Sequence, residues 1–160
     1  MSRNLANDRI EGLGLRNLRQ DVYQVTSEEN RRYNCFAWAA GDVRRRWEPD
    51  LRGERFWPIA QREYTLECYV EAFKTLGYQP CSTGDFEEGY QKVVIYADRN
   101  LPAHMARQLE SGRWTSKLGN WEDIRHETPE VVEGTEYGKV AQFLKRRRTE
   151  PDPEPPLPIS

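Results

Sequence analysis

The clearest periodic pattern in the chain lies in its middle third. Within "EYTLECYVEAFKTLGY" the apolar residues recur at helical spacing, and Gly77 follows them where a left-handed C-terminal cap is expected. The run "YQKVVIYA" is rich in β-branched and aromatic residues, which is typical of a strand. The segment "AHMARQLESGRWTSKLG" predicts two more strands joined at Ser111-Gly112. The pattern thus predicts a helix followed by an antiparallel sheet of three strands.

Two more helices are predicted outside this region. The first begins at Cys35, where "CFAWAAGD" is an apolar run that follows a polar segment. The second covers "TEYGKVAQFLKRRR", residues 135–148, which places apolar residues at helical spacing and basic residues in its last turn. Helices that come first and strands that come later favour an α+β fold, with N-terminal helices packed on a small antiparallel sheet and a C-terminal helix.

The length of 160 residues is typical of one domain. Residues 1–22 show weak periodicity and are expected to form an irregular arm, whereas residues 23–148 hold the predicted elements. Residues 149–160, "TEPDPEPPLPIS", contain five of the ten prolines and alternate them with acids. We expect this last segment to be a disordered tail.

Composition narrows the possible partners. The 24 basic and 26 acidic residues give a formal charge of -2, and the runs "RRRW" and "KRRR" have acidic neighbours, so we expect no binding to nucleic acid. The chain has no stretch long and apolar enough to cross a membrane and no apolar leader, which predicts a cytoplasmic protein, with signal-independent secretion left open. Three widely spaced cysteines favour neither disulfides nor a metal site, and no cofactor is expected.

Cys35 carries the candidate chemistry. A thiol in the first turn of a helix lies near the positive end of the helix dipole, which would lower its pKa and leave it exposed as a nucleophile. The same turn offers backbone N–H groups to a developing oxyanion, and Asn34 could add a side-chain donor. Trp38 fits the core better than a ligand platform, although it is a residue that could line a cleft. A small buried core cysteine is the competing interpretation of Cys35.

A nucleophilic cysteine needs a base, and the chain has two histidines. His104 opens a predicted strand that can face a helix packed on the sheet, so we expect it to be the base. His126, in the segment "DIRHETPE", is better interpreted as a structural histidine hydrogen-bonded at the edge of an element. Asn120 or Asp123 could orient the imidazole, and the residues do not choose between them. Ser116 and Lys117, on the strand after His104, are weaker candidates for the same role.

These features resemble a known family. A cysteine at a helix start, a following strand that opens with histidine and a polar residue on or after the next strand are similar to the small bacterial papain-like hydrolases of NlpC type and CHAP type. The segments "YNCFAWAAGD", "FWP", "KVVIYA", "DIRH" and "YGKV" are similar to an uncharacterised group of bacterial domains. The resemblance implies a papain-like fold with Cys35 as nucleophile and His104 as base.

The sequence therefore predicts a cysteine hydrolase or acyltransferase that acts on a protein or peptide-like substrate through a Cys35 thioester. A protease, an amidase and a deamidase all remain open. The alternative is a non-catalytic protein-interaction module, in which Cys35 is inert and the proline-rich tail is a ligand for other proteins.

Overall fold

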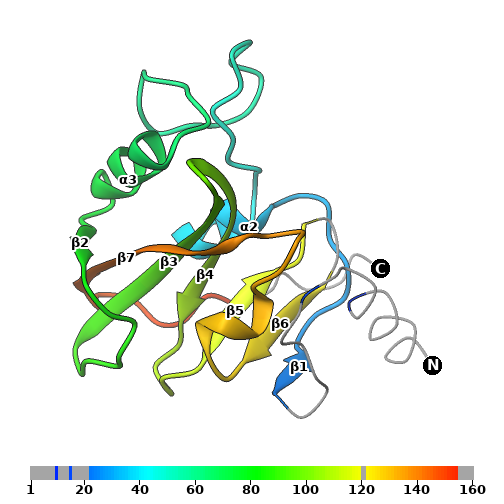
Figure 1. Ribbon diagram of the computed structural model, residues 1–160, viewed down its shortest axis with the longest axis vertical. Helices are drawn as coiled ribbons and strands as arrows, with labels where there is room; N and C mark the ends of the chain where they lie inside the picture. Colours follow the sequence, from blue (N-terminus) through cyan, green and yellow to red (C-terminus); the bar gives the residue numbers. More distant parts are fainter. Residues whose placement is uncertain (1–9, 11–14, 16–21, 120–121, 155–160) are drawn as a thin grey trace.

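The computed structural model describes residues 10, 15, 22–119 and 122–154. Its centre is a seven-stranded sheet in the order β1-β6-β5-β4-β3-β7-β2, with every neighbouring pair antiparallel (Figure 1). The strands are β1 (Tyr23–Val25), β2 (Gln79–Cys81), β3 (Tyr90–Asp98), β4 (Leu101–Gln108), β5 (Trp114–Lys117), β6 (Asp123–His126) and β7 (Lys139–Arg147). The helices are α2 (Cys35–Ala40), α3 (Leu66–Lys74) and the 3₁₀ helix η1 (Pro129–Val132).

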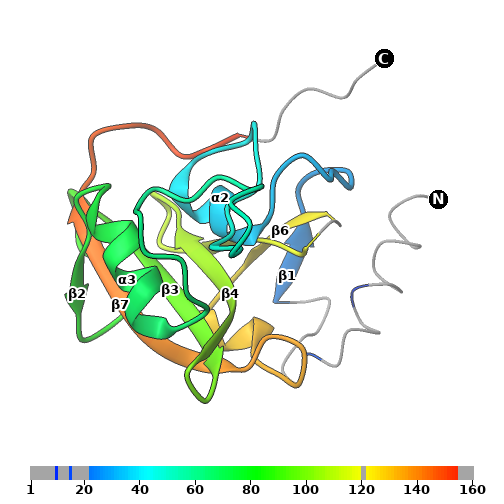
Figure 2. The same cartoon turned by 90° about the horizontal axis from the view of Figure 1, so that it is seen from above.

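The sheet separates two hydrophobic clusters. One face, called the helix face below, carries alternate residues such as Ile95 and Met105, and α2 and α3 pack on it (Figure 2). The opposite face carries the intervening residues, including Tyr96 and Ala106, in a second cluster with the η1 residue Val132. Because side chains alternate along a strand, these clusters show which way the neighbouring polar residues point.

The two helices form where local capping signals predict them. Asn34 caps α2, since its Oδ1 accepts the Ala37 N–H at 3.0 Å, and Gly41 ends the helix with φ 85°. Thr65 caps α3 by accepting the Cys68 N–H at 3.2 Å. The predictions of a helix starting at Cys35 and of a longer helix after residue 63 are therefore confirmed.

The predicted papain-like α+β fold is wrong, because the chain is mostly an antiparallel sheet with two short α-helices among the described residues. The three predicted strands are present as β3, β4 and β5. Sequence reasoning missed the short strands β1, β2 and β6, each of which is three or four residues long and carries too little pattern to recognise.

The largest local error is the predicted helix over residues 135–148. This segment instead forms β7, which pairs with β3 along its length and with β2 on its other side. The alanine, leucine, lysine and arginine residues that suggested a helix have high helix propensity, but two-sided strand pairing outweighs it. Among the described residues, no helix is long and apolar enough to span a bilayer.

Gly138 marks where β7 begins, and it requires glycine for two reasons. Its φ is 77°, and a Cβ built there would lie 2.4 Å from the Ala97 carbonyl oxygen in the neighbouring strand. Ala97 is held by the β3–β4 hairpin, so its backbone has little room to move. The start of β7 is therefore defined by a close backbone approach rather than by a turn sequence.

We predict that Gly138→Ala lowers the free energy of unfolding by more than about 2 kcal/mol, since it combines positive-φ strain with a backbone clash. Gly77→Ala is the matched control, because Gly77 also has a positive φ of 94° but a Cβ there meets nothing within 4 Å. The control should lose only about 1 kcal/mol. Urea unfolding of the three proteins measures both values, and equal losses would contradict the proposed backbone contact.

Candidate thiol–imidazole site

The candidate site lies where β4 and β5 stop pairing. The two strands pair at Gln108–Trp114 and Arg107–Thr115, and their pairing ends there. Cys35, the first residue of α2, lies beside this end, since the N–H of Met105 on β4 is directed at its sulfur. The first turn of α2 adds the N–H of Phe36. The thiol is thus placed against backbone donors from both a helix and a strand.

The environment of Cys35 differs from the exposed, activated thiol that its position at a helix start predicted. The residue is only 6% exposed. Burial raises the pKa of the Cys35 thiol to about 11, and the N–H groups of Met105 and Phe36 and the charge of Lys117 lower it by less. A helix of six residues has a short dipole, so desolvation outweighs it. The resting site therefore holds a neutral thiol.

His104 lies on β4 and points to the face opposite α2. Its imidazole stacks on the Tyr137 ring, with centroids 4.1 Å apart, and also contacts Tyr96. The residue is fully buried, and burial lowers the pKa of its imidazole to about 3. At neutral pH His104 is uncharged, with one protonated and one bare ring nitrogen.

A chain of hydrogen bonds crosses three strands from His104. Its Nε2 lies 3.0 Å from Ser116 Oγ on β5, which lies 2.8 Å from Nε2 of His126 on β6. The Nδ1 of His126 then lies 2.8 Å from the Thr128 carbonyl oxygen. Each contact joins side chains on the same face of the sheet, because Ser116 is diagonal to both histidines across the strands.

These hydrogen bonds determine which ring nitrogens of His104 and His126 carry a proton. A carbonyl oxygen only accepts, so His126 donates from Nδ1 to Thr128. Burial lowers the pKa of His126 to about 4, so this imidazole is neutral and its Nε2 is bare. Ser116 must then donate its hydroxyl proton to His126 and accept from His104 Nε2–H. It follows that His104 carries its proton on Nε2 and a free lone pair on Nδ1.

His104 Nδ1 has no hydrogen-bond partner among the described residues, although it is buried. A bare, basic nitrogen inside a protein usually finds a donor, so an unpartnered one suggests a functional role. The link between Cys35 and His104 is indirect. The Met105 N–H that lowers the pKa of the Cys35 thiol belongs to the residue after His104, and burial and then the charge of Cys35 raise the pKa of Tyr137, which stacks on His104. No hydrogen bond joins Cys35 to His104 within the described part of the chain.

The two residues predicted to orient His104 do not do so in the described structure. Asp123 lies on the helix face, where its Oδ2 accepts the Tyr33 hydroxyl at 2.8 Å. Burial raises the pKa of Asp123 to about 6, against smaller effects of Tyr33 and Lys117 that lower it. Period-two alternation puts Asp123 on the opposite side of the sheet from His104. Asn120 lies outside the described residues.

The predicted substrate-binding residues have structural contacts. The Oδ1 of Asn34 accepts the N–H of Ala37, and its Nδ2 donates to the Trp47 carbonyl at 2.8 Å. Trp38 is 2% exposed and donates from its indole to Thr115 Oγ1 at 3.0 Å. Both side chains have their polar groups engaged within the fold, which supports the core interpretation of Trp38.

Ser116 and His126 complete the site, and sequence reasoning did not assign them these roles. The sequence favours Asn120 and Asp123 over Ser116 as the partner of His104. It predicts His126 to be a structural histidine that is hydrogen-bonded at the edge of an element. The structure bears out that hydrogen bond, to Thr128, and shows a second one to Ser116. The signal that could have found them is alternation, since residues 104, 116 and 126 share one face once the hairpin register is known.

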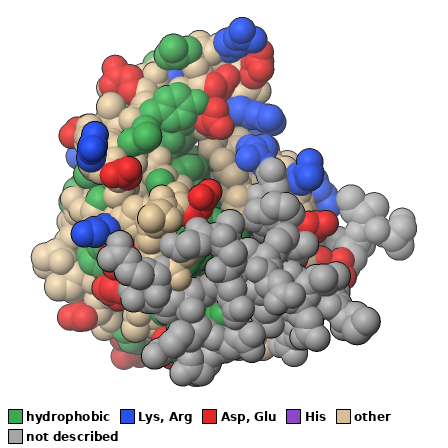
Figure 3. All heavy atoms as spheres, turned by 45° about the vertical axis from the view of Figure 1, so that its right-hand side comes forward, with side chains coloured by type: hydrophobic (Ala, Val, Ile, Leu, Met, Phe, Trp, Pro, Cys, Tyr) green, Lys and Arg blue, Asp and Glu red, His purple; other side chains and the backbone are tan. Residues whose placement is uncertain are grey.

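A pocket lies next to the loop that carries Tyr137. This pocket of about 680 Å³ is lined by residues that flank this tyrosine on both sides, including Gly134 and Gly138, and by Ala97 to Arg99. Gly134 and Gly138 exchange both backbone hydrogen bonds and close a short loop that carries Tyr137. The molecular face drawn in Figure 3 shows hydrophobic, acidic and basic side chains but no histidine, in agreement with the burial of both imidazoles.

The fold and site define a β-rich domain with a buried thiol at the start of α2 and a buried imidazole on β4 whose tautomer is fixed by hydrogen bonds. The family model described as "Domain of unknown function (DUF7689)" matches residues 24–145, and the chain belongs to this family. No curated protein and no solved structure matches the chain. The match agrees with the predicted likeness to an uncharacterised domain family and provides no link to the NlpC-type or CHAP-type hydrolases.

The two buried histidines predict how stability depends on pH. Their folded pKa values of about 3 and about 4 lie below the unfolded value of about 6.5. Between about pH 6.5 and pH 4 the unfolded chain therefore binds more protons, and the free energy of unfolding falls as pH decreases. Asp123, whose pKa is raised, opposes this trend below about pH 6.

We predict that His126→Gln removes one of the two imidazoles that take up a proton when the protein unfolds. From pH 6 to pH 5 the free energy of unfolding should decrease less steeply in the variant than in the unsubstituted protein. The two slopes should differ by about 1.4 kcal/mol per pH unit. The Asp123 contribution is common to both proteins and cancels in the difference. Urea unfolding at several pH values measures the two slopes, and parallel curves would show that His126 is not buried as a neutral imidazole.

Proposed function

We propose that the domain is a cysteine-dependent acyl-transfer enzyme, with Cys35 as nucleophile and His104 as base. The observation that carries the proposal is the bare, buried and unpartnered Nδ1 of His104, whose lone pair is enforced by the hydrogen bonds through Ser116 and His126. A nitrogen in this state is what a neutral thiol needs as a proton acceptor.

In the proposed reaction the Cys35 thiol gives its proton to His104 Nδ1 while the sulfur attacks the carbonyl carbon of an amide or thioester. The carbon–sulfur bond forms, the leaving group departs with the proton from His104, and a thioester remains on Cys35. Water or an amine then attacks the thioester and releases the free enzyme. The N–H groups of Met105 and Phe36 lower the pKa of the thiol and are therefore suited to stabilise the negative charge that develops on the sulfur as its proton leaves.

Three buried residues support this division of roles. Lys117 lies close enough to Cys35 for its charge to lower the pKa of the thiol, so it would stabilise a thiolate as it forms. Burial lowers the pKa of Lys117 itself to about 8. Ser116 and His126 act as positioning residues, because they touch His104 or its partner and not the thiol.

Access to the thiol requires a movement, because Cys35 and His104 are both buried. The Tyr137 loop is the proposed moving part. Its Tyr137 ring stacks on His104, its other residues Gly134, Thr135 and Gly138 line the pocket, and glycines lie at both of its ends. A peptide-like acyl group could enter through this pocket and displace the Tyr137 ring from the imidazole.

The test is covalent labelling with a panel of peptide acyloxymethyl ketones, which alkylate a nucleophilic cysteine with loss of their carboxylate, followed by mass spectrometry of the intact and digested protein. We expect an adduct on Cys35, and His104→Gln should slow its formation by about 100-fold or more. Ser116→Ala should slow it by about 10-fold or more, because the tautomer of His104 is no longer fixed. Cys81→Ser is the control, since Cys81 lies on the edge strand β2 and its loss should leave the Cys35 rate unchanged.

Folding of each variant is checked by thermal unfolding. Labelling of Cys81 alone, or of Cys35 only after unfolding, would contradict the enzyme proposal and favour the non-catalytic module. Labelling of Cys35 at an equal rate in His104→Gln would contradict the role of the histidine. Product analysis with peptide thioester and glutamine-containing substrates separates hydrolysis, amine transfer and deamidation.

A further inference from the structure

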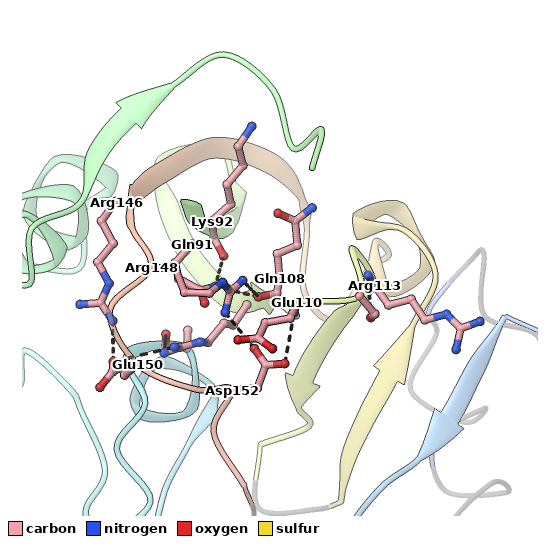
Figure 4. Close-up of polar contacts among 12 residues, drawn as sticks. Gln91, Lys92, Gln108, Glu110, Arg113, Arg146, Arg148, Glu150 and Asp152 are labelled. Atoms are coloured by element: carbon pink, nitrogen blue, oxygen red, sulfur yellow. Dashed lines mark hydrogen bonds and ion pairs between the residues drawn. The ribbon is translucent and has the colours of Figure 1, made fainter. Parts of the chain in front are cut away.

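Three arginines gather on the helix face near the end of β7. Arg107 on β4 is 1% exposed, and Arg146 and Arg148 are 13% and 12% exposed at their side chains (Figure 4). Such burial brings three like charges together, which is costly unless anions are close by. The cluster of Arg107, Arg146 and Arg148 is called the arginine cradle below.

The chain fills the cradle with its own acidic residues. Arg146 Nη2 lies 2.7 Å from Glu150 Oε1, and Arg107 Nη2 lies 3.8 Å from the same oxygen. Arg148 Nη1 lies 2.9 Å from Asp152 Oδ1. The other carboxylate oxygen of Asp152 accepts the backbone N–H of Glu110 at 3.1 Å. The two carboxylates therefore occupy separate parts of one site.

The tail sequence suits this binding mode. Pro151 separates Glu150 from Asp152, and the ion pairs of Glu150 with Arg146 and of Asp152 with Arg148 bring both side chains to the cradle. Both acids can thus face the cradle at once. The residues around them, "EPDPEPP", repeat the same acid–proline alternation.

The cradle also retains donors that the tail does not use. The Nε atoms of Arg107 and Arg146 are buried and have no hydrogen-bond partner among the described residues. Three guanidinium groups face two carboxylates, so one positive charge is uncompensated within the cradle. Glu150 is 52% exposed at its side chain, which means that another carboxylate can replace it without unfolding of the domain.

We propose that the arginine cradle is a docking site for an extended acidic peptide segment of a partner protein, and that residues 150–152 occupy it when the partner is absent. A ligand with two carboxylates two residues apart can bind both the Arg107 and Arg146 part and the Arg148 part of the site. One small anion can bind only one of these parts. Arginine recognises carboxylates through planar paired donors, which favours such a peptide. This proposal is independent of the chemistry proposed for Cys35.

Competition with the tail determines the expected result. A tethered segment has an effective concentration of roughly millimolar, so the intact protein should bind an added peptide weakly. The probe is a fluorescein-labelled peptide of residues 149–160, TEPDPEPPLPIS, and the proteins are the full chain and its Glu150→Gln/Asp152→Asn variant. Release of the tail should strengthen peptide binding by about 10-fold or more in fluorescence anisotropy.

Two further changes test the chemistry of the cradle. Arg148→Gln in the tail-released variant should abolish saturable binding, whereas Arg147→Gln is the matched control, because Arg147 is exposed and contacts the Tyr90 ring instead. A peptide with Gln and Asn in place of its first Glu and Asp should not bind. Higher salt should weaken binding of the acidic peptide, as expected for charge pairing.

Three outcomes would overturn the proposal. The first is that the tail-released variant unfolds at the normal temperature but shows no saturable peptide binding, and the second is that the neutral peptide binds as well as the acidic one. The third is that Arg148→Gln and Arg147→Gln reduce peptide binding equally. Displacement of the peptide by inorganic phosphate at the same concentration would identify a site for small anions rather than for peptides. Each of these results leaves the labelling experiment on Cys35 unaffected.

Discussion

The hydrogen bond from His126 Nδ1 to the Thr128 carbonyl is the interaction on which the proposed site depends. Because a carbonyl only accepts, it fixes the proton on one nitrogen of His126, and the order of the protons follows through Ser116 to His104. The chain of contacts is a consequence of sheet geometry, since all three side chains lie on one face of β4, β5 and β6. A backbone group at the end of β6 thus determines which nitrogen of His104 is basic.

Burial keeps this arrangement inert at rest. It raises the pKa of Cys35 and lowers that of His104, so both groups are neutral and proton transfer between them is strongly unfavourable in the closed protein. A bound acyl group would change this balance by providing a carbonyl for the sulfur to attack as its proton leaves. A buried, neutral thiol is expected to react slowly with small electrophiles and oxidants.

Local features of the fold could be predicted from sequence, and long-range ones could not. The cap at Asn34, the helix after Thr65 and the strand "YQKVVIYA" depend on neighbouring residues, and each is present. The segment that became β7 has a helical composition and is a strand only because β3 and β2 pair with it from both sides. That pairing joins residues far apart in the sequence, and no pattern within residues 135–148 reveals it.

The same distinction applies to the site. Cys35 and His104 were recognisable because their residue types are rare and their positions follow element starts. The partner of His104 depends on the register of β4, β5 and β6, which joins residues that no local pattern pairs. With this register, alternation places Ser116 beside the imidazole and Asp123 on the opposite face of the sheet.

The most direct measurement of the central claim is the tautomer of His104 by ¹⁵N NMR of protein labelled only in histidine. The chain has two histidines, so the His126→Gln variant assigns both sets of ring signals. The account predicts, at pH 7, a neutral His104 with a protonated Nε2 and an unprotonated Nδ1, beside a His126 protonated on Nδ1. A His104 that carries its proton on Nδ1, or is charged at this pH, would contradict it.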